Sequence, residues 1–342
     1  MSKRVSIRDV ARLACVSHTT VSLALRKDPR ITTEVKQRVE KAADHLGYHP
    51  HAVVSDLMAQ LRSLKYRAET ATLGFITAWP TRDGWKESSN HRRFYEGVKR
   101  RALEVGYNVD SFWLREPGMT SRRMSRILYT RSIRGLILLS LPKAHGHLSL
   151  EWQYFAAVTK GLTIFRPKLH RVISSHYEDM QLVVHQLRKL GYRRYGLVLS
   201  ADQDERTDRA WLAAYLLHQH DSPACDRVPA MVLNGTDDFR KFSQWYIQNR
   251  PEAILFAGVP IPAWVAELKL RVPEEVGLVV LDWSEEDSAL AGIDADGEAQ
   301  GMAAVDLLIG QLHAHEYSIP KKEKIVAVRG RWIDGRSLFL RR

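Results

Sequence analysis

The residues whose side chains are best suited to recognising a ligand form a short, mostly polar run near the N-terminus. His18, Thr19 and Thr20 stand together, and Ser22 and Leu23 follow. Imidazole and hydroxyl groups hydrogen-bond to base edges, and the threonine methyl and the Leu23 side chain suit contact with a thymine methyl. The run therefore has the composition of a surface that reads the major groove of DNA. The alternative interpretation is a solvated polar helix without a partner.

Two short helices are predicted to position this run. Ser6 and Asp9 form a capping-box pattern at the start of the first helix. Ser17 is the predicted N-cap of the second helix. A third helix is predicted to begin at Thr32 and to end at Gly47, a residue favoured just beyond a helix. Two short helices separated by three residues indicate a helix-turn-helix, whose second helix enters the major groove. The apolar residues expected inside this unit are Ile7, Val10, Ala11, Val21, Ala24, Leu25, Val35, Val39, Ala42 and Leu46.

The charge of the chain agrees with a polyanionic partner. The formal net charge is +12, and residues 1–65 carry half of that excess. A positive field attracts nucleic acid, although a basic surface without a partner would have the same composition. Basic side chains in this region would contact phosphates, which position the domain without reading sequence. These residues are Arg4, Arg8, Arg12, Lys27, Arg30 and Lys36.

Three segments carry a resemblance to a known family. Ile7–Ala14 (IRDVARLA), Val16–Ser22 (VSHTTVS) and Leu46–Pro50 (LGYHP) resemble the signature of the lactose-repressor (LacI/GalR) family in order and spacing. The resemblance implies that His18, Thr19 and Leu23 read bases. The full set of candidate DNA-contacting residues is Ser6, Arg8, Ser17, His18, Thr19, Thr20, Ser22, Leu23, Arg30, Tyr48 and Leu57.

The segment that follows Pro50 is, by the same resemblance, a hinge helix that orders on operator DNA. Residues 52–59 are too few to hold a helix alone in water. The resemblance places Leu57 as an apolar wedge in the minor groove, and such a wedge kinks a base step. The alternative is that Leu57 packs within the linker.

Three departures from the family pattern concern the operator more than the binding mode. Cys15 stands where a turn glycine is usual, and a positive φ there would cost about 1 kcal/mol. Leu23 replaces the usual arginine and thereby removes a guanine contact. Arg26–Pro29 (RKDP) replaces the common asparagine-glycine turn.

The remainder of the chain alternates short apolar runs with amphipathic stretches, beyond a polar linker at residues 60–70. Such alternation predicts parallel sheets covered by helices on both faces. Strands are expected at 72–79, 107–114, 133–139, 162–165, 195–200, 228–233, 253–256, 277–281 and 324–329. Helices are expected at 92–106, 121–132, 150–158, 178–190, 206–220, 239–249, 262–270 and 298–313.

Residues 71–335 resemble the periplasmic-binding-protein-like type I core of the same family. Leu190–Arg194 (LGYRR) and Val272–Gly277 (VPEEVG) match segments typical of it. The predicted fold is therefore an all-α helix-turn-helix domain at 1–50, a hinge helix and linker at 51–70, and an α/β core of two doubly wound lobes. The N-lobe is expected at about 71–166 and 294–322, and the C-lobe at about 167–293 and 323–335.

The effector is expected in the cleft beyond the carboxyl ends of the strands. An arginine opposite an aspartate would hold hydroxyls or a carboxylate, and tryptophans would stack on a ring. Candidate residues are Trp79, Arg82, Arg166, Arg209, Asp282 and Trp283. The alternatives are core packing for either tryptophan, and for Arg209 an ion pair with a nearby aspartate.

Two departures in this cleft affect the expected ligand. Ala257–Pro260 (AGVP) replaces the usual alanine-asparagine-aspartate, and Arg166 stands where sugar-binding members place an aspartate. An anionic or aromatic effector therefore fits better than a simple sugar. A cleft that has lost its ligand is the other interpretation.

Several other classes of protein are disfavoured. The sequence has no phosphate-binding glycine loop and no hydrolase or metalloprotease motif, so no enzyme is predicted. Cys15 and Cys225 form no disulfide framework, and the close pairs His145/His147 and His313/His315 have no acidic or cysteine companions, so no metal and no cofactor is expected. No signal peptide and no membrane span is evident, which favours the cytoplasm over a transporter's solute-binding protein.

The sequence therefore predicts a transcription regulator that binds a near-palindromic operator as a homodimer. Closure of the lobes on an effector would change the spacing of the hinge helices. A repressor that binds DNA without any effector is the remaining alternative.

Overall fold

The computed structural model describes residues 6–25, 31–46, 71–235 and 238–341. The chain divides into two compact units, Met1–Glu69 and Thr70–Arg342. Each unit has its own apolar core, and they are described separately below.

The N-terminal unit contains the three predicted helices, α1 (Ile7–Leu13), α2 (His18–Leu25) and α3 (Thr33–Leu46). The predicted caps are present. The Ser6 backbone N–H and Oγ both donate to Asp9 Oδ2, at 3.0 and 2.6 Å, and Ser17 Oγ accepts from the Thr20 N–H at 3.1 Å. These bonds satisfy backbone donors that a helix start leaves free. The three helices enclose a small core of Val10, Ala11, Ala14, Val21, Ala24, Val39, Ala42 and Ala43.

The turn between α1 and α2 contains a strained residue. Cys15 has a φ of +53°, in the left-handed region that glycine adopts without penalty. The condition under which this position carries a backbone cost is therefore met.

The first lobe of the C-terminal unit is built on a parallel six-stranded sheet of order β13-β7-β5-β3-β1-β2. Helices α5 (Ser89–Glu104) and α12 (Gly297–Ala314) cover one face and α6 (Ser121–Thr130) the other, as the two apolar clusters on either side of the sheet show. The strands are β1 (Ala71–Thr77), β2 (Tyr107–Trp113), β3 (Gly135–Leu138), β5 (Ala156–Lys160), β7 (His170–Ser174) and β13 (Ile325–Val328). A short two-stranded sheet pairs β4 (Gly146–His147) with β6 (Ile164–Arg166).

The second lobe has a six-stranded sheet of order β14-β12-β11-β10-β8-β9, in which only β14 runs antiparallel. Helices α7 (His176–Lys189) and α9 (Ala210–Asp221) pack on one face. Helices α10 (Asp238–Asn249) and α11 (Ile261–Glu267) pack on the other. The strands are β8 (Tyr195–Ser200), β9 (Met231–Leu233), β10 (Ala253–Ala257), β11 (Gly277–Val280), β12 (Ala291–Asp294) and β14 (Arg331–Ile333), and α8 (Ala201–Arg206) follows β8.

The predicted lobe boundaries are wrong in two places. Strand β7 pairs with β5 and β13 pairs with β7, so residues 170–174 and 325–328 belong to the first lobe. The chain therefore crosses between the lobes after β7, between β12 and α12, and between β13 and β14. The predicted helix at 150–158 is instead a 3₁₀ turn (Trp152–Tyr154) followed by β5. Short apolar runs do not distinguish a strand from a buried helix.

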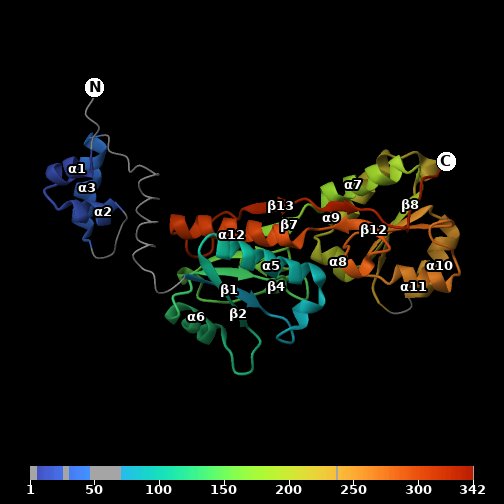
Figure 1. Cartoon of the computed structure of the whole chain (residues 1–342), viewed down its shortest axis with the longest axis horizontal. Coiled ribbons are helices and arrows are strands. Elements are labelled where there is room, and N and C mark those ends of the chain that lie inside the picture. Colours follow the sequence, from blue (N-terminus) through green and yellow to red (C-terminus); the bar gives the residue numbers. More distant parts are fainter. Residues whose placement is uncertain (1–5, 26–30, 47–70, 236–237, 342) are drawn as a thin grey trace. The chain divides into compact units, whose positions relative to one another are not determined.

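Helices α5 and α12 lie side by side on the first sheet (Figure 1). Glycines make this close approach possible. A Cβ at Gly97 would collide with the Glu298 carbonyl, and one at Gly301 would collide with the Phe94 carbonyl. This packing fixes the N-terminal end of α5, from which several cavity residues come.

Candidate functional site

The N-terminal end of α2 presents the predicted base-reading residues. His18 and Thr19 are exposed, and Thr20 and Leu23 are partly exposed. Ser17 Oγ caps the helix and also lies 2.8 Å from the Thr20 hydroxyl, so these two predicted contacts are tied to each other. The helix start thus exposes an imidazole and a hydroxyl on the surface of the N-terminal unit.

The other predicted DNA contacts fall into two groups. Arg8 is exposed on α1, while the Ser6 hydroxyl is bonded to Asp9. Arg30, Tyr48 and Leu57 lie outside the described residues, and the side chain of Ser22 is also not described.

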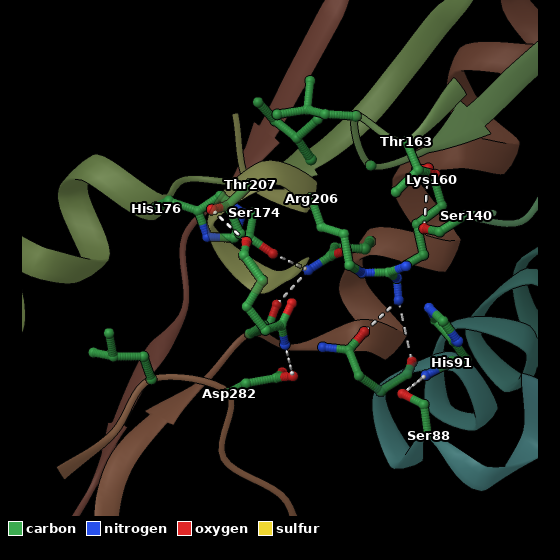
Figure 2. Close-up of a pocket in the computed structure, with 18 of the residues that line it drawn as sticks. Ser88, His91, Ser140, Lys160, Thr163, Ser174, His176, Arg206, Thr207 and Asp282 are labelled. Carbon is green, nitrogen blue, oxygen red and sulfur yellow. Dashed lines mark hydrogen bonds between the residues drawn. The ribbon is translucent and has the colours of Figure 1, made fainter. Parts of the chain in front are cut away.

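A cavity of about 260 Å³ lies between the two lobes, beyond the carboxyl ends of the strands. This is where parallel sheets hold ligands. Ser140 follows β3, Lys160 ends β5, and Asp282 follows β11, so that both sheets contribute. Figure 2 shows Lys160, Ser140 and Thr163 on one side of the space and His176, Ser174 and Thr207 on the other.

Two of the six predicted effector residues line this cavity, Trp79 and Asp282. Trp79 Nε1 donates to the Ser140 carbonyl at 2.9 Å, and its ring packs edge-on against His91 at 5.5 Å. Asp282 Oδ2 accepts from Gln203 Nε2 at 3.4 Å. The two residues come from different lobes, as the cleft prediction requires.

The other four predicted residues lie outside the cavity. Arg82 is exposed, and Arg166 is exposed beside the ring of Phe165, at 5.8 Å. Arg209 has a side chain that is 74% exposed and pairs with Asp204 at 3.8 Å, which is the ion-pair alternative. Trp283 packs against the second-lobe core because its large apolar ring is better buried there.

Sequence reasoning missed the two cations that do line the cavity, Lys160 and Arg206. Lys160 is 6% exposed, and its Nζ donates to the carbonyl and side-chain oxygens of Asn90 and lies 4.9 Å from the Phe94 ring. Burial lowers the pKa of Lys160 to about 7. Had β5 been predicted to end at Lys160, its position at a strand end would have marked it.

Arg206 connects the two lobes across the cavity. Its side chain is 16% exposed, and Nη1 donates to the carbonyls of Leu141 and Pro142 at 2.8 and 2.7 Å. Arg206 belongs to α8 of the second lobe, whereas both carbonyls follow β3 of the first. The guanidinium is therefore held in place by neutral acceptors from the opposite lobe.

Three buried nitrogen atoms of the cavity wall have no hydrogen-bond partner within the described part of the chain: His91 Nδ1, His176 Nδ1 and Trp211 Nε1. His91 is 7% exposed and Trp211 is 4% exposed. Burial lowers the pKa of His176 to about 4, so this imidazole is neutral at pH 7. Buried polar atoms are rarely unsatisfied, so these nitrogens leave hydrogen-bonding capacity for a molecule in the cavity.

Two negative findings apply to the described ranges. No group of three or more potential metal-binding side chains occurs there. None of the helices described is long and apolar enough to cross a membrane.

Comparisons with known proteins agree with this architecture. A family model of bacterial regulatory proteins of the lacI family matches residues 6–51, and one of a periplasmic binding protein-like domain matches residues 184–338. The transcriptional repressor PurR of Escherichia coli O1:K1 is 24% identical over an alignment of 358 positions, which covers 97% of this chain and 96% of PurR.

Solved structures show the same fold at low identity. The transcriptional regulator CelR in complex with cellobiose aligns with a TM-score of 0.57 and 17% identity, over 98% of this chain and 100% of CelR. The Lac repressor dimer bound to operator and the anti-inducer ONPF aligns with a TM-score of 0.55 and 19% identity, over 98% and 100% of the two chains.

A helix-turn-helix unit followed by a periplasmic-binding-protein-like core defines a class of DNA-binding transcription regulators. The chain belongs to the LacI/GalR family of that class.

Proposed function

We propose that this protein is a homodimeric repressor that binds a near-palindromic operator. Its affinity for the operator would rise or fall when a small molecule occupies the interlobe cavity. The observation that carries the proposal is the capped start of α2, which exposes His18 and Thr19 from a compact three-helix unit. The likeness to the repressor PurR supports it. The proposed role is to bind operator DNA and regulate transcription, without catalysing a reaction. The proposed location is the cytoplasm.

The cavity supports the effector part of the proposal. Its lining comes from both lobes, so a ligand there would favour one relative arrangement of the lobes over another. The first lobe, whose strand β1 directly follows the segment that joins the core to the DNA-binding unit, would transmit that preference to it. A titration of operator affinity against cavity ligands tests this step, and an affinity that no ligand changes would favour a repressor without effector control.

The DNA-reading assignment predicts different effects for Thr19 and Arg8. Thr19→Ala should alter base preference, because Thr19 would contact a base edge. Arg8→Ala should weaken binding to every duplex and lower the salt slope by about 1, because Arg8 would contact a phosphate. Binding of the variants to a randomised duplex pool at several salt concentrations measures both effects. Arg115→Ala, which removes an exposed charge from the C-terminal unit, is the control and should change neither.

Leu57, which lies outside the described residues, is proposed as the minor-groove wedge on the strength of the family resemblance alone. Leu57→Ala should weaken specific binding and leave nonspecific binding nearly unchanged. An equal loss on operator and competitor DNA would rule out the wedge.

A further inference from the structure

Among the described residues, Lys160 is a buried amine that makes no direct ion pair; the Asp282 carboxylate acts on it only through space. Its Nζ contacts the two oxygens of Asn90 and the Phe94 ring, all of them neutral. Among the described residues, no carboxylate oxygen lies within 4.0 Å of this nitrogen. Lysine is almost never buried to this extent unless it is paired. An anion that enters the cavity would provide the missing partner.

Arg206 supplies a second cation with unused donors in the same cavity. Both of its hydrogen bonds leave from Nη1, and its nearest carboxylate, Asp202, lies 3.9 Å from Nε. Within the described ranges, no residue accepts a hydrogen bond from Nη2. A carboxylate is the group that suits the planar fork of a guanidinium.

The remainder of the cavity wall is suited to ligand hydroxyl groups, whose oxygen atoms both accept and donate hydrogen bonds. The Trp211 indole N–H can only donate, and it is buried without an acceptor among the described residues. Asp282 and Gln203 can receive or provide bonds to ligand hydroxyls. Hydroxyl side chains complete the lining: Ser88, Ser140, Thr163, Ser174 and Thr207. A hydroxylated ligand body fits this surface better than an alkyl or purely aromatic one.

The volume limits the size of the ligand. About 260 Å³ lies just below the range of roughly 300–1,000 Å³ typical of small-molecule pockets. We propose that the cavity binds a sugar acid of single-residue size, with its carboxylate between Lys160 and Arg206 and its hydroxyls toward the polar wall (Figure 2). This inference rests on the proposed function, because it takes the cavity as the effector site.

Ligand charge then couples binding to pH. The charged or titratable groups around Lys160 are Arg206 on α8, Arg93 and His91 on α5, and Asp282 after β11. Burial lowers the pKa of Lys160 to about 7 in the empty cavity, and a neighbouring carboxylate would raise it. Binding therefore takes up a proton, so affinity is highest below about pH 7 and falls as the pH rises above it.

The test is calorimetric titration of the full-length protein with matched pairs, in which each hexuronate or aldonate is compared with its neutral hexose or alditol. At least one acid should bind about tenfold or more tightly than its neutral partner. That acid should bind roughly 20-fold more weakly at about pH 8.5 than at about pH 6.5. Lys160→Met should reduce the affinity about tenfold or more and abolish the pH dependence. The matched control is Lys168→Met, which removes a 54% exposed lysine outside the cavity and should leave both unchanged.

Three results would overturn the inference: neutral partners that bind as tightly as the acids, no binding of any acid, or a Lys160→Met protein with unaltered affinity. Retained DNA binding shows that the Lys160→Met protein is folded. If Lys160→Met does not fold, Arg206→Lys provides a second test of the carboxylate site. If an acid binds but leaves DNA affinity unchanged, the proposed function is contradicted and the ligand assignment stands. If DNA affinity responds only to neutral ligands, the ligand assignment is contradicted and the proposed function stands.

Discussion

Cys15 occupies a position where glycine would be easier to accommodate. Its φ of +53° costs an L-residue energy because Cβ approaches the following carbonyl. The side chain is exposed, and its one hydrogen bond within the described part of the chain is long, from Sγ to the Arg12 carbonyl at 3.8 Å. The strain is therefore not offset by packing.

Cys15→Gly should stabilise the N-terminal unit by about 1 kcal/mol, because glycine adopts this conformation without the steric cost. In the full-length protein, amide hydrogen exchange in α1 and α3 should slow by about fivefold. Cys225→Gly is the control, since Cys225 is also exposed but lies outside the positive-φ residues. Unchanged exchange in the Cys15 variant would show that the turn is not strained.

Asp179 is a buried carboxyl on α7 that accepts the Gly330 N–H at 2.8 Å. Burial raises its pKa to about 6, so between about pH 4 and pH 6 the folded protein holds a proton that the unfolded chain has released. Stability should therefore fall as the pH rises through this window.

Asp179→Asn keeps an acceptor for Gly330 but cannot ionise. Relative to this variant, the wild type should lose up to about 3 kcal/mol of stability between about pH 4 and about pH 7. Urea denaturation of both proteins across that range measures the difference. A stability difference that does not vary with pH would contradict the buried, proton-holding carboxyl.

The composition of the cavity could be predicted only in part, because its key residues depend on long-range placement. Trp79 and Asp282 follow apolar runs that are evident in the sequence. Lys160 ends a strand that resembles part of a helix when read alone, and Arg206 acts through carbonyls more than sixty residues away. Arg209 was predicted instead from the family resemblance. The helix expected at 206–220 is interrupted, Arg209 is a left-handed residue at that interruption, and its side chain is exposed.

Among the elements, α5 and α12 are joined most closely. Gly97 of α5 faces the backbone of Glu298 on α12 without room for a methyl group. Gly310, which lies on α12, has open space around it. The same residue type therefore has opposite consequences at two positions of one helix pair.

Gly97→Ala should destabilise the C-terminal unit by about 1–3 kcal/mol, since the two helices must move apart. Gly310→Ala should stabilise it by about 0.5–1 kcal/mol, because alanine is the better helix former. Urea midpoints of the two full-length variants test the pair. Equal effects would contradict the close packing of these helices.

Element prediction succeeded where periodicity was long and failed where it was short. The three N-terminal helices and the long helices of the core were placed within a few residues. Strands β7, β12 and β14 were missed because runs of three to five residues carry little pattern. The omission of β7, with which β13 pairs, moved the predicted lobe boundaries.

At the scale of the C-terminal unit, the two lobes are connected by side-chain contacts as well as by the three crossings of the chain. Asp294, 1% exposed at the end of β12, accepts from Arg93 of α5 at 2.6 Å and from Arg331 of β14 at 2.8 Å. Burial opposes ionisation of Asp294, but the hydrogen bonds from these arginines hold its pKa below the usual range. Together with Arg206, this cluster would let a cavity ligand affect both lobes at once.

The central claim is that the N-terminal unit reads a specific duplex sequence. Selection of a random duplex library by the full-length protein at moderate salt tests it most directly. The account predicts enrichment of a near-palindromic motif that changes when Thr19 is replaced. Recovery of duplexes without any sequence preference over bulk competitor would contradict it.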